Sequence, residues 1–246
     1  MDEQQRKASR HHRPQQPHGE TWHTPKGRAI REVVFGMTDG VVTTIGFLTG
    51  IHGSEISREY LLLAAMAEAF AGTLSMAFGA YLSSKSQKEY FEQEIAREKR
   101  EIVEMPSEEI QEIREIFRAK GFKEEEVDIV VKRITADQEQ WLKFMLREEL
   151  GLFEEQFDNP VKIAAIMGIS FFVGSFSPII PYFFTTSWVA LVASLLIGVG
   201  SLFALGAGKT RLTRTNWLKS GLEMTGIGTA AAAIGYLLGS LASRIT

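Results

Sequence analysis

The sequence predicts an all-α membrane protein with five transmembrane helices and a cytoplasmic three-helix acidic domain inserted between the second and third spans. A helix crosses a bilayer with about 20 mainly apolar residues. Runs of this kind with few charges occupy residues 33–51, 60–82, 161–184, 187–207 and 221–242. By contrast, residues 84–159 carry 13 Lys and Arg but 21 Asp and Glu, a net charge of −8, whereas the rest of the chain carries +5.

The chain therefore divides into four parts. We expect a disordered polar tail at 1–28, two transmembrane helices within 29–83, a cytoplasmic helical domain at 84–159 and three further spans within 160–243. The tail has no apolar core of signal-peptide length. Its histidines are candidates for loose metal binding, although a flexible tail is the simpler interpretation: His11, His12, His18 and His23. Because there is no cysteine, any metal site must use oxygen, imidazole or thioether ligands.

Basic residues set the orientation of the spans. Arg28 and Arg31 precede the first span, and the loop at 208–220 holds four basic residues and no acid. The loops on the other side carry at most one basic residue each. Since Lys and Arg gather on the cytoplasmic side, we expect the N-terminus and the acidic domain inside and the C-terminus outside.

Small residues recur four apart within the spans, a spacing that lets helices approach closely. Packing within one subunit and a dimer interface are equally expected from this spacing. The pairs are Gly36/Gly40, Gly46/Gly50, Ala231/Gly235 and Gly235/Gly239. Pro178 and Pro181 mark the end of the third span.

Two acids lie inside the apolar runs. Asp39 belongs to the first span and Glu68 to the second, each near the middle of neighbouring antiparallel helices. A carboxylate there costs roughly 2.5–3.5 kcal/mol on insertion scales. Neither run contains Lys or Arg, so a proton or a bound cation must neutralise the acids. A site that alternates between the two would exchange protons for cations, while protonated packing residues are the alternative.

A methionine and hydroxyl groups accompany these acids. Met76 follows Glu68 by eight residues and lies close to the same helix face. Thr43 and Thr44 follow Asp39 by about one turn. A thioether beside two carboxylates favours a transition metal over Mg²⁺ or Ca²⁺. Asp39, Glu68, Met76 and Thr43 are therefore the candidate transport pathway.

The acidic domain is predicted to be helical throughout. The first helix continues from the second span through 87–105 and stops at Pro106, and the second covers 108–120 with Ser107 as its N-cap. After a short helix-forming stretch at 124–134, the last helix covers 138–157.

Glutamates form rows on these helices. Their spacing is i, i+3 or i, i+4, so each row lines one helix face, and a bundle could direct the rows toward one another. The rows are Glu94, Glu98 and Glu101; Glu109, Glu112 and Glu115; and Met145 with Glu148 and Glu149. From spacing alone, a solvated charged face is favoured over a metal site. The domain has no histidine, unlike a di-iron bundle. No phosphate loop, nucleophile–base pair or HExxH motif is present, so no enzyme is expected.

Four segments carry a resemblance to a known family. GMTDGVVTTIGFLTG, AEAFAGTLSMAFGAYLSSKSQ, WLKFMLREELGL and FFVGSFSPIIPYFF resemble the vacuolar iron transporter family, in the same order over about residues 29–242. The resemblance implies a homodimer with five spans per subunit that exports Fe²⁺, and often Mn²⁺ or other divalent ions, from the cytosol in exchange for protons. It also implies a pathway between the two subunits and makes 84–159 a metal-binding domain.

The resemblance also assigns residues. Asp39, Glu68 and Met76 match the pathway positions, and the metal ligands match Glu98, Glu101, Glu109, Glu112, Met145 and Glu149. These assignments overturn the solvated face that spacing alone favours. Where plant members have two consecutive methionines, this chain has Met145 and Leu146, and Leu146 cannot act as a ligand.

The expected function is thus proton-coupled export of Fe²⁺, with Mn²⁺, Zn²⁺ or Co²⁺ as further substrates and no cofactor or nucleic-acid partner. The alternative is a membrane-anchored protein that binds or senses divalent metal without transport. A carrier for an organic cation is a third possibility. The membrane is expected to be the plasma membrane or a vacuole-type membrane, since no targeting signal is visible.

Overall fold

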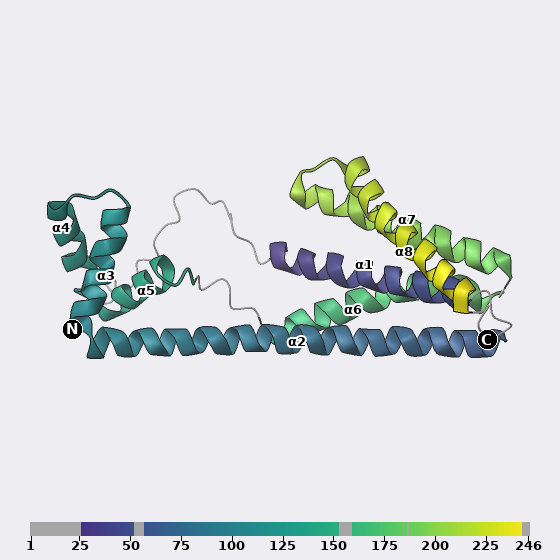
Figure 1. The fold of residues 1–246 in the computed structure, drawn as a ribbon, viewed down its shortest axis with the longest axis horizontal. Helices are drawn as coiled ribbons and strands as arrows, with labels where there is room; N and C mark the ends of the chain where they lie inside the picture. The colour runs from purple at the N-terminus through teal and green to yellow at the C-terminus, as the bar shows by residue number, and fades with distance from the viewer. Residues whose placement is uncertain (1–25, 52–56, 153–158, 186, 243–246) are drawn as a thin grey trace, which may run out of the picture.

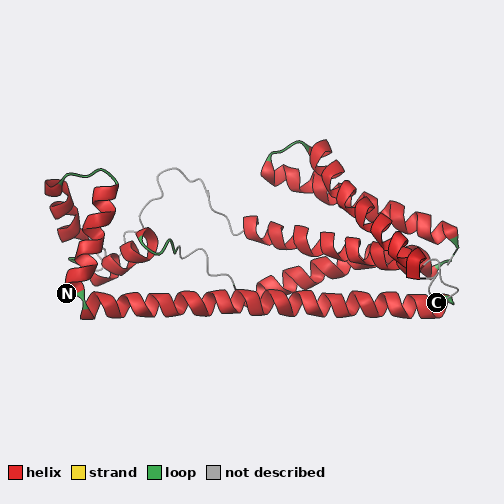
Figure 2. Ribbon diagram, in the orientation of Figure 1, coloured by secondary structure: helices red, strands yellow, loops and turns green. Residues whose placement is uncertain are grey.

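The computed structural model describes residues 26–51, 57–152, 159–185 and 187–242. The described segments are helical and contain no strand (Figure 2). Except for its last three residues, the predicted tail with its histidines lies outside them. The helices are α1 (Lys26–Ile51), α2 (Arg58–Glu104), α3 (Pro106–Ala119), α4 (Glu124–Ile134), α5 (Gln138–Glu148), α6 (Pro160–Ile179), the 3₁₀ helix η2 (Ile180–Phe183), α7 (Trp188–Thr213) and α8 (Trp217–Ala242).

The predicted fold class is confirmed. Five helices, α1, α2, α6, α7 and α8, are long and apolar enough to span a membrane. The shorter helices α3–α5 lie between the second and third spans in the chain. With 47 residues, α2 is about 70 Å long at 1.5 Å per residue. It runs along the whole molecule and carries α3–α5 at the end remote from the spans (Figure 1).

Close packing of α1 explains several of the small residues. A Cβ on Gly40 would lie 2.3 Å from the carbonyl oxygen of Phe171 in α6. A Cβ on Gly235 of α8 would lie 2.6 Å from the carbonyl oxygen of Gly46. These glycines therefore let α1 approach α6 and α8 of the same chain. For Gly40 and Gly235, the small residues thus serve packing within one subunit.

The chain turns sharply after α2, and here the predicted N-cap is wrong. Pro106 occupies the first turn of α3 and Met105 is its N-cap, so Ser107 lies inside the helix. Proline suits this position because a helix leaves the first N–H groups without a partner. The turn folds α3 back toward α2, and an apolar core forms beneath it from Ile102, Ile113, Val127, Val131, Trp141 and Met145.

Two other predicted helix ends differ from the structure. The last helix of the domain, predicted to continue to residue 157, ends at Glu148, and Gly151 adopts a positive φ of 63°. Glycine enters this conformation without the steric cost of a Cβ, so it ends the helix. In the other direction, α7 continues to Thr213, which places much of the predicted basic loop on helix. Pro178 lies in the last turn of α6 and Pro181 in η2, so the third span ends where the prolines predict.

Candidate functional site

Three glutamates meet in the helical domain and form what we call the acid cluster: Glu98, Glu109 and Glu149. Glu98 lies near the end of α2, Glu109 in the first turn of α3, and Glu149 directly after α5. Each offers a carboxylate oxygen, and these atoms lie within 4.8 Å of one another. Glu98 is 1% exposed and Glu109 is 4% exposed, whereas Glu149 faces solvent. The turn at Pro106 makes this meeting possible because it brings the start of α3 beside the end of α2.

Burial and mutual repulsion raise the pKa values of the carboxyl groups in the acid cluster. Burial, together with the charges of Glu149 and Glu109, raises the pKa of Glu98 from 4.5 to about 8. Burial and the neighbouring carboxylates raise the pKa of Glu149 to about 7, and burial raises that of Glu109. Oε1 of Glu98 and Oε2 of Glu109 are buried and accept no hydrogen bond from the described residues. A bound cation would give these two oxygens the partner that they lack.

The other predicted ligands surround the acid cluster less closely. Glu112 and Glu101 are half-buried. After burial, the charge of Glu112 is the largest cause of the raised pKa of Glu149, followed by those of Glu109 and Glu101. Glu101 also forms an ion pair of 3.5 Å with Arg97. Met145 is fully buried in the apolar core of the domain and precedes Glu149 by one helical turn.

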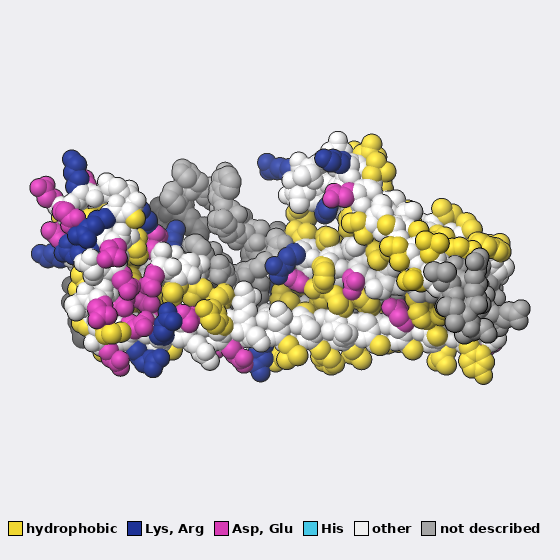
Figure 3. Space-filling view, viewed as in Figure 1, with side chains coloured by type: hydrophobic (Ala, Val, Ile, Leu, Met, Phe, Trp, Pro, Cys, Tyr) yellow, Lys and Arg dark blue, Asp and Glu magenta, His cyan; other side chains and the backbone are white. Residues whose placement is uncertain are grey.

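Other glutamates of the domain form ordinary surface contacts. Glu94 pairs with Arg97, Glu148 pairs with Lys120, and Glu115 accepts a hydrogen bond from Gln111. The solvated charged face that spacing suggested is therefore correct for these residues. Figure 3 shows acidic side chains gathered on the helical domain, while apolar side chains cover the spans.

The acids within the spans lie on α1 and α2, and both are half-buried. Thr44 Oγ1 donates a hydrogen bond of 3.1 Å to Glu68 Oε2 and so connects the two helices. Thr43 instead donates to the Asp39 carbonyl oxygen of its own helix, at 2.8 Å. Among the described residues no Lys or Arg forms an ion pair with Asp39 or Glu68. The hydroxyl groups of both Thr44 and Thr43 thus lie beside Glu68, and the hydrogen bond from Thr44 is the one with a defined length.

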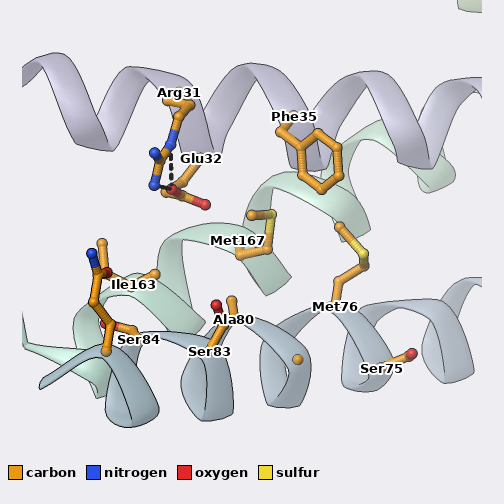
Figure 4. A pocket seen from close by; sticks show the side chains of 12 residues that line it. Arg31, Glu32, Phe35, Ser75, Met76, Ala80, Ser83, Ser84, Ile163 and Met167 are labelled. Carbon is orange, nitrogen blue, oxygen red and sulfur yellow. Dashed lines mark hydrogen bonds and ion pairs between the residues drawn. The ribbon is translucent and has the colours of Figure 1, made fainter. Parts of the chain in front are cut away.

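A cavity of about 840 Å³ opens between α1, α2 and α6 beside Met76, and we call it the entrance cavity. Arg31, Glu32, Met76 and Met167 are among the residues that line it (Figure 4). Glu32 is a buried acid that the sequence analysis missed. It precedes Asp39 by seven residues, so both lie on one face of α1. The sequence places it on the same helix face as Asp39, whereas its burial depends on packing against α6.

Five spanning helices, acids inside two of them and an acid cluster outside the membrane region define an integral membrane protein built to handle cations. The chain belongs to the VIT family, whose model matches residues 30–240. Vacuolar iron transporter 1 of Arabidopsis thaliana is 33% identical over 217 residues, covering 88% of this chain and 87% of the relative.

Relatives outside plants match as extensively. The vacuolar iron transporter of Plasmodium falciparum is 30% identical over 235 residues, which cover 90% of this chain and 85% of that protein. A second plant relative, vacuolar iron transporter 1 of Oryza sativa, is 31% identical over 229 residues, which cover 93% of this chain and 88% of that protein. The family resemblance is therefore confirmed, and with it the prediction that the chain is not an enzyme.

Proposed function

We propose that this protein is a homodimeric antiporter that exports Fe²⁺, and also Mn²⁺ or other divalent transition metals, from the cytosol in exchange for protons. Proteins named vacuolar iron transporters match this chain over 85–87% of their own length. The observation that carries the proposal is the continuity of α2. One unbroken helix holds Glu68 among the spans and Glu98 in the acid cluster.

The acid cluster is the proposed capture site on the cytoplasmic side. Carboxylate oxygens bind Fe²⁺ and Mn²⁺, and a divalent charge relieves the repulsion among Glu98, Glu109 and Glu149. Glu101 and Glu112 are proposed as additional ligands at its edge. Met145, which precedes Glu149 by one turn, is proposed as the thioether ligand of the acid cluster. Because two of these carboxyl groups have pKa values of about 7 and 8, metal binding releases protons at neutral pH.

From the acid cluster the metal follows α2 toward the spans. Met76 precedes Glu98 by 22 residues, so the two residues are about 33 Å apart along the axis of α2. Their directions around the helix axis differ by about 40°. The two residues therefore lie on nearly the same face of one helix. Small and polar α2 residues, including Ser83, Ser84 and Gln87, line the entrance cavity along this face.

Exchange takes place at the membrane acids. Asp39 and Glu68 have no cationic side chain as partner, so each is neutralised either by a proton or by the transported ion. Release of the ion on the far side lets protons replace it, and the protons return toward the cytosol. Thr44 orients Glu68 from α1, which couples the two acids structurally.

A dimer fits the exposed apolar surface of α2. Only 17% of the most apolar 18-residue stretch of α2 is buried within the chain. Large apolar residues follow one another along the uncovered part: Leu63, Phe70, Leu74, Phe78 and Leu82. A second copy of the chain would cover this surface and close a pathway between two α2 helices.

A metal-binding or sensing protein without transport is the second candidate, because the acid cluster alone would serve it. Uptake of Fe²⁺ into proteoliposomes containing the purified protein separates the two. A transporter accumulates Fe²⁺ and loses this activity with Asp39→Asn. In a sensor, Asp39→Asn leaves metal binding intact and no variant accumulates metal. The membrane itself is proposed to be a vacuole-type or plasma membrane.

A further inference from the structure

We propose that the entrance cavity is a second metal site, in which Glu32, Met76 and Met167 are the ligands. In the absence of metal, Arg31 forms an ion pair with Glu32, and a divalent ion displaces it. The inference rests on the proposed function and deepens it. It places a soft, selective site between the acid cluster and the acids of the spans, and it gives roles to Arg31, Glu32 and Met167.

Glu32 is a charged side chain that the fold buries at the wall of a cavity. It is 6% exposed, and the hydrogen bonds that it accepts from the described residues both come from Arg31, whose Nε lies 2.9 Å and whose Nη2 lies 2.6 Å from the same oxygen, Oε1. Adjacent residues on a helix do not face each other, so Arg31 must fold back to make this contact. In Figure 4 the second carboxylate oxygen lies on the side facing Met167.

Two thioethers complete the donor set from the other helices. Met167 of α6 is 5% exposed, and a Cβ on Gly36 would lie 3.1 Å from its sulfur. Gly36 is one turn after Glu32, so the missing side chain leaves room for the sulfur beside that carboxylate. Met76 approaches from α2 on the opposite wall (Figure 4). One carboxylate with two thioethers favours Fe²⁺ and Co²⁺ over Mn²⁺, Mg²⁺ or Ca²⁺.

Arg31 suits the role of a displaceable cation. Its side chain is 75% exposed, so it can leave for water at little cost, whereas an unpaired buried carboxylate would be costly. Arginine is always charged, which keeps Glu32 paired whenever no metal is present. A divalent ion carries twice the charge of the guanidinium and competes with it, while a monovalent ion does not.

The size of the cavity determines how the ion arrives. A volume of about 840 Å³ is much larger than a bare ion. It has room for an ion with its water shell, since each water occupies about 30 Å³ of liquid. The hydroxyl groups of Ser83 and Ser84 line the α2 wall and can replace some of these waters. The ion therefore enters hydrated and exchanges water for sulfur at Met76 and Met167.

Metal binding to the purified full chain tests the site. The acid cluster is first disabled by Glu98→Gln, Glu109→Gln and Glu149→Gln, and the acids of the spans by Asp39→Asn and Glu68→Gln; anaerobic equilibrium dialysis then measures Fe²⁺ and Mn²⁺ separately. We expect one Fe²⁺ per chain to remain and to be lost with Glu32→Gln. The control Glu223→Gln alters an exposed acid of α8 outside the cavity and should change nothing.

Volume-conserving variants test the sulfur ligand. Met167→Leu should weaken Fe²⁺ binding about tenfold, in the range seen when metal-site residues are altered, and should weaken Mn²⁺ binding less. The control Met224→Leu changes a methionine that is buried to the same degree in α8 and should bind both metals as the parent does. Equal affinities for Met167→Leu and its parent, or an equal loss in Met224→Leu, would overturn the thioether site.

Arg31→Gln tests the displaced cation. Removing the competitor should raise the affinity for both metals up to about fivefold, which corresponds to about 1 kcal/mol for an ion pair whose arginine faces solvent. Unchanged or weaker binding would contradict the role of Arg31. The binding results can be separated from transport. If the protein transports Fe²⁺ but Glu32→Gln and Met167→Leu bind Fe²⁺ as the parent does, the second metal site is excluded. If the parent protein does not transport Fe²⁺, the proposed function is excluded.

Discussion

Thr44 and Glu68 join the first two spans directly, through a hydrogen bond of 3.1 Å from the threonine hydroxyl to the carboxylate. Thr44 is completely buried, and α6 packs against both α1 and α2. The bond therefore lies in the interior of the bundle, between two helices that each carry a membrane acid. The position of Glu68 depends on α1 as well as on its own helix.

Replacing Thr44 by valine keeps the shape and removes this hydrogen bond. We expect slower Fe²⁺ uptake, because Glu68 loses the donor that orients it, and a loss of about 1–3 kcal/mol of unfolding free energy. Uptake into proteoliposomes and thermal unfolding in detergent measure the two effects. Thr229→Val is the control, since Thr229 is exposed and its hydroxyl bonds only to the Thr225 carbonyl of its own helix. Equal uptake by both variants would show that the contact is dispensable.

The acid cluster should account for tight metal binding by the helical domain. Glu98→Gln keeps the size of the side chain and removes its charge, so Fe²⁺ or Co²⁺ affinity should fall by about 10- to 100-fold. Isothermal titration calorimetry of the full chain checks this. Glu124→Gln is the matched control because Glu124 pairs with Arg118 away from the cluster. A comparable loss in both variants would mean that the domain binds metal only through its net charge.

The stability of the metal-free protein should fall as the pH rises from about 4.5 to about 8. Glu98 has a pKa of about 8 in the folded chain but an ordinary value of 4.5 when unfolded. Within that window the folded chain holds a proton that the unfolded chain has released, so folding becomes less favourable with pH. Unfolding curves along a pH series measure this slope. Glu98→Gln should flatten it, and a parent curve that rises through the window would contradict the assignment.

Gly40 should tolerate no side chain. A Cβ there would lie 2.3 Å from the Phe171 carbonyl oxygen and 2.8 Å from the Ser175 nitrogen, both backbone atoms of α6. Gly40→Ala should therefore destabilise the protein by about 1–3 kcal/mol, as overpacking of a core does. Gly200→Ala, with nothing within 4 Å of the added Cβ, should be neutral or stabilising. Equal thermal midpoints for the two variants would exclude close packing of α1 on α6.

The spans were predictable because each apolar run is long and lightly charged. Asp39 and Glu68 stood out for the same reason, as acids in runs that otherwise exclude charge. The acid cluster was harder to predict. The spacing of Glu98 and Glu109 places each on a helix face, but only the reversal at Pro106 and the apolar core around Ile113 bring those faces together.

Other features depend on packing that no local pattern contains. Glu32 follows an arginine at the edge of a span and looks like an ordinary interfacial charge; its burial depends on α6, more than 100 residues further along the chain. The helix predicted to reach residue 157 ends at Glu148 because Gly151 takes a positive φ. The residues around Gly151 contain no pattern that predicts this conformation. Met145 fits the helix periodicity of a ligand row and the apolar core equally well.

Simultaneous recording of Fe²⁺ entry and internal pH in proteoliposomes tests the central claim most directly. The experiment compares the parent protein with Asp39→Asn under a Fe²⁺ gradient and no imposed pH gradient. We expect Fe²⁺ entry to drive protons out of the vesicles, so that the internal pH rises, and Asp39→Asn to abolish both signals. Fe²⁺ entry with no change in internal pH, or full activity of Asp39→Asn, would contradict proton-coupled exchange at the acids of the spans.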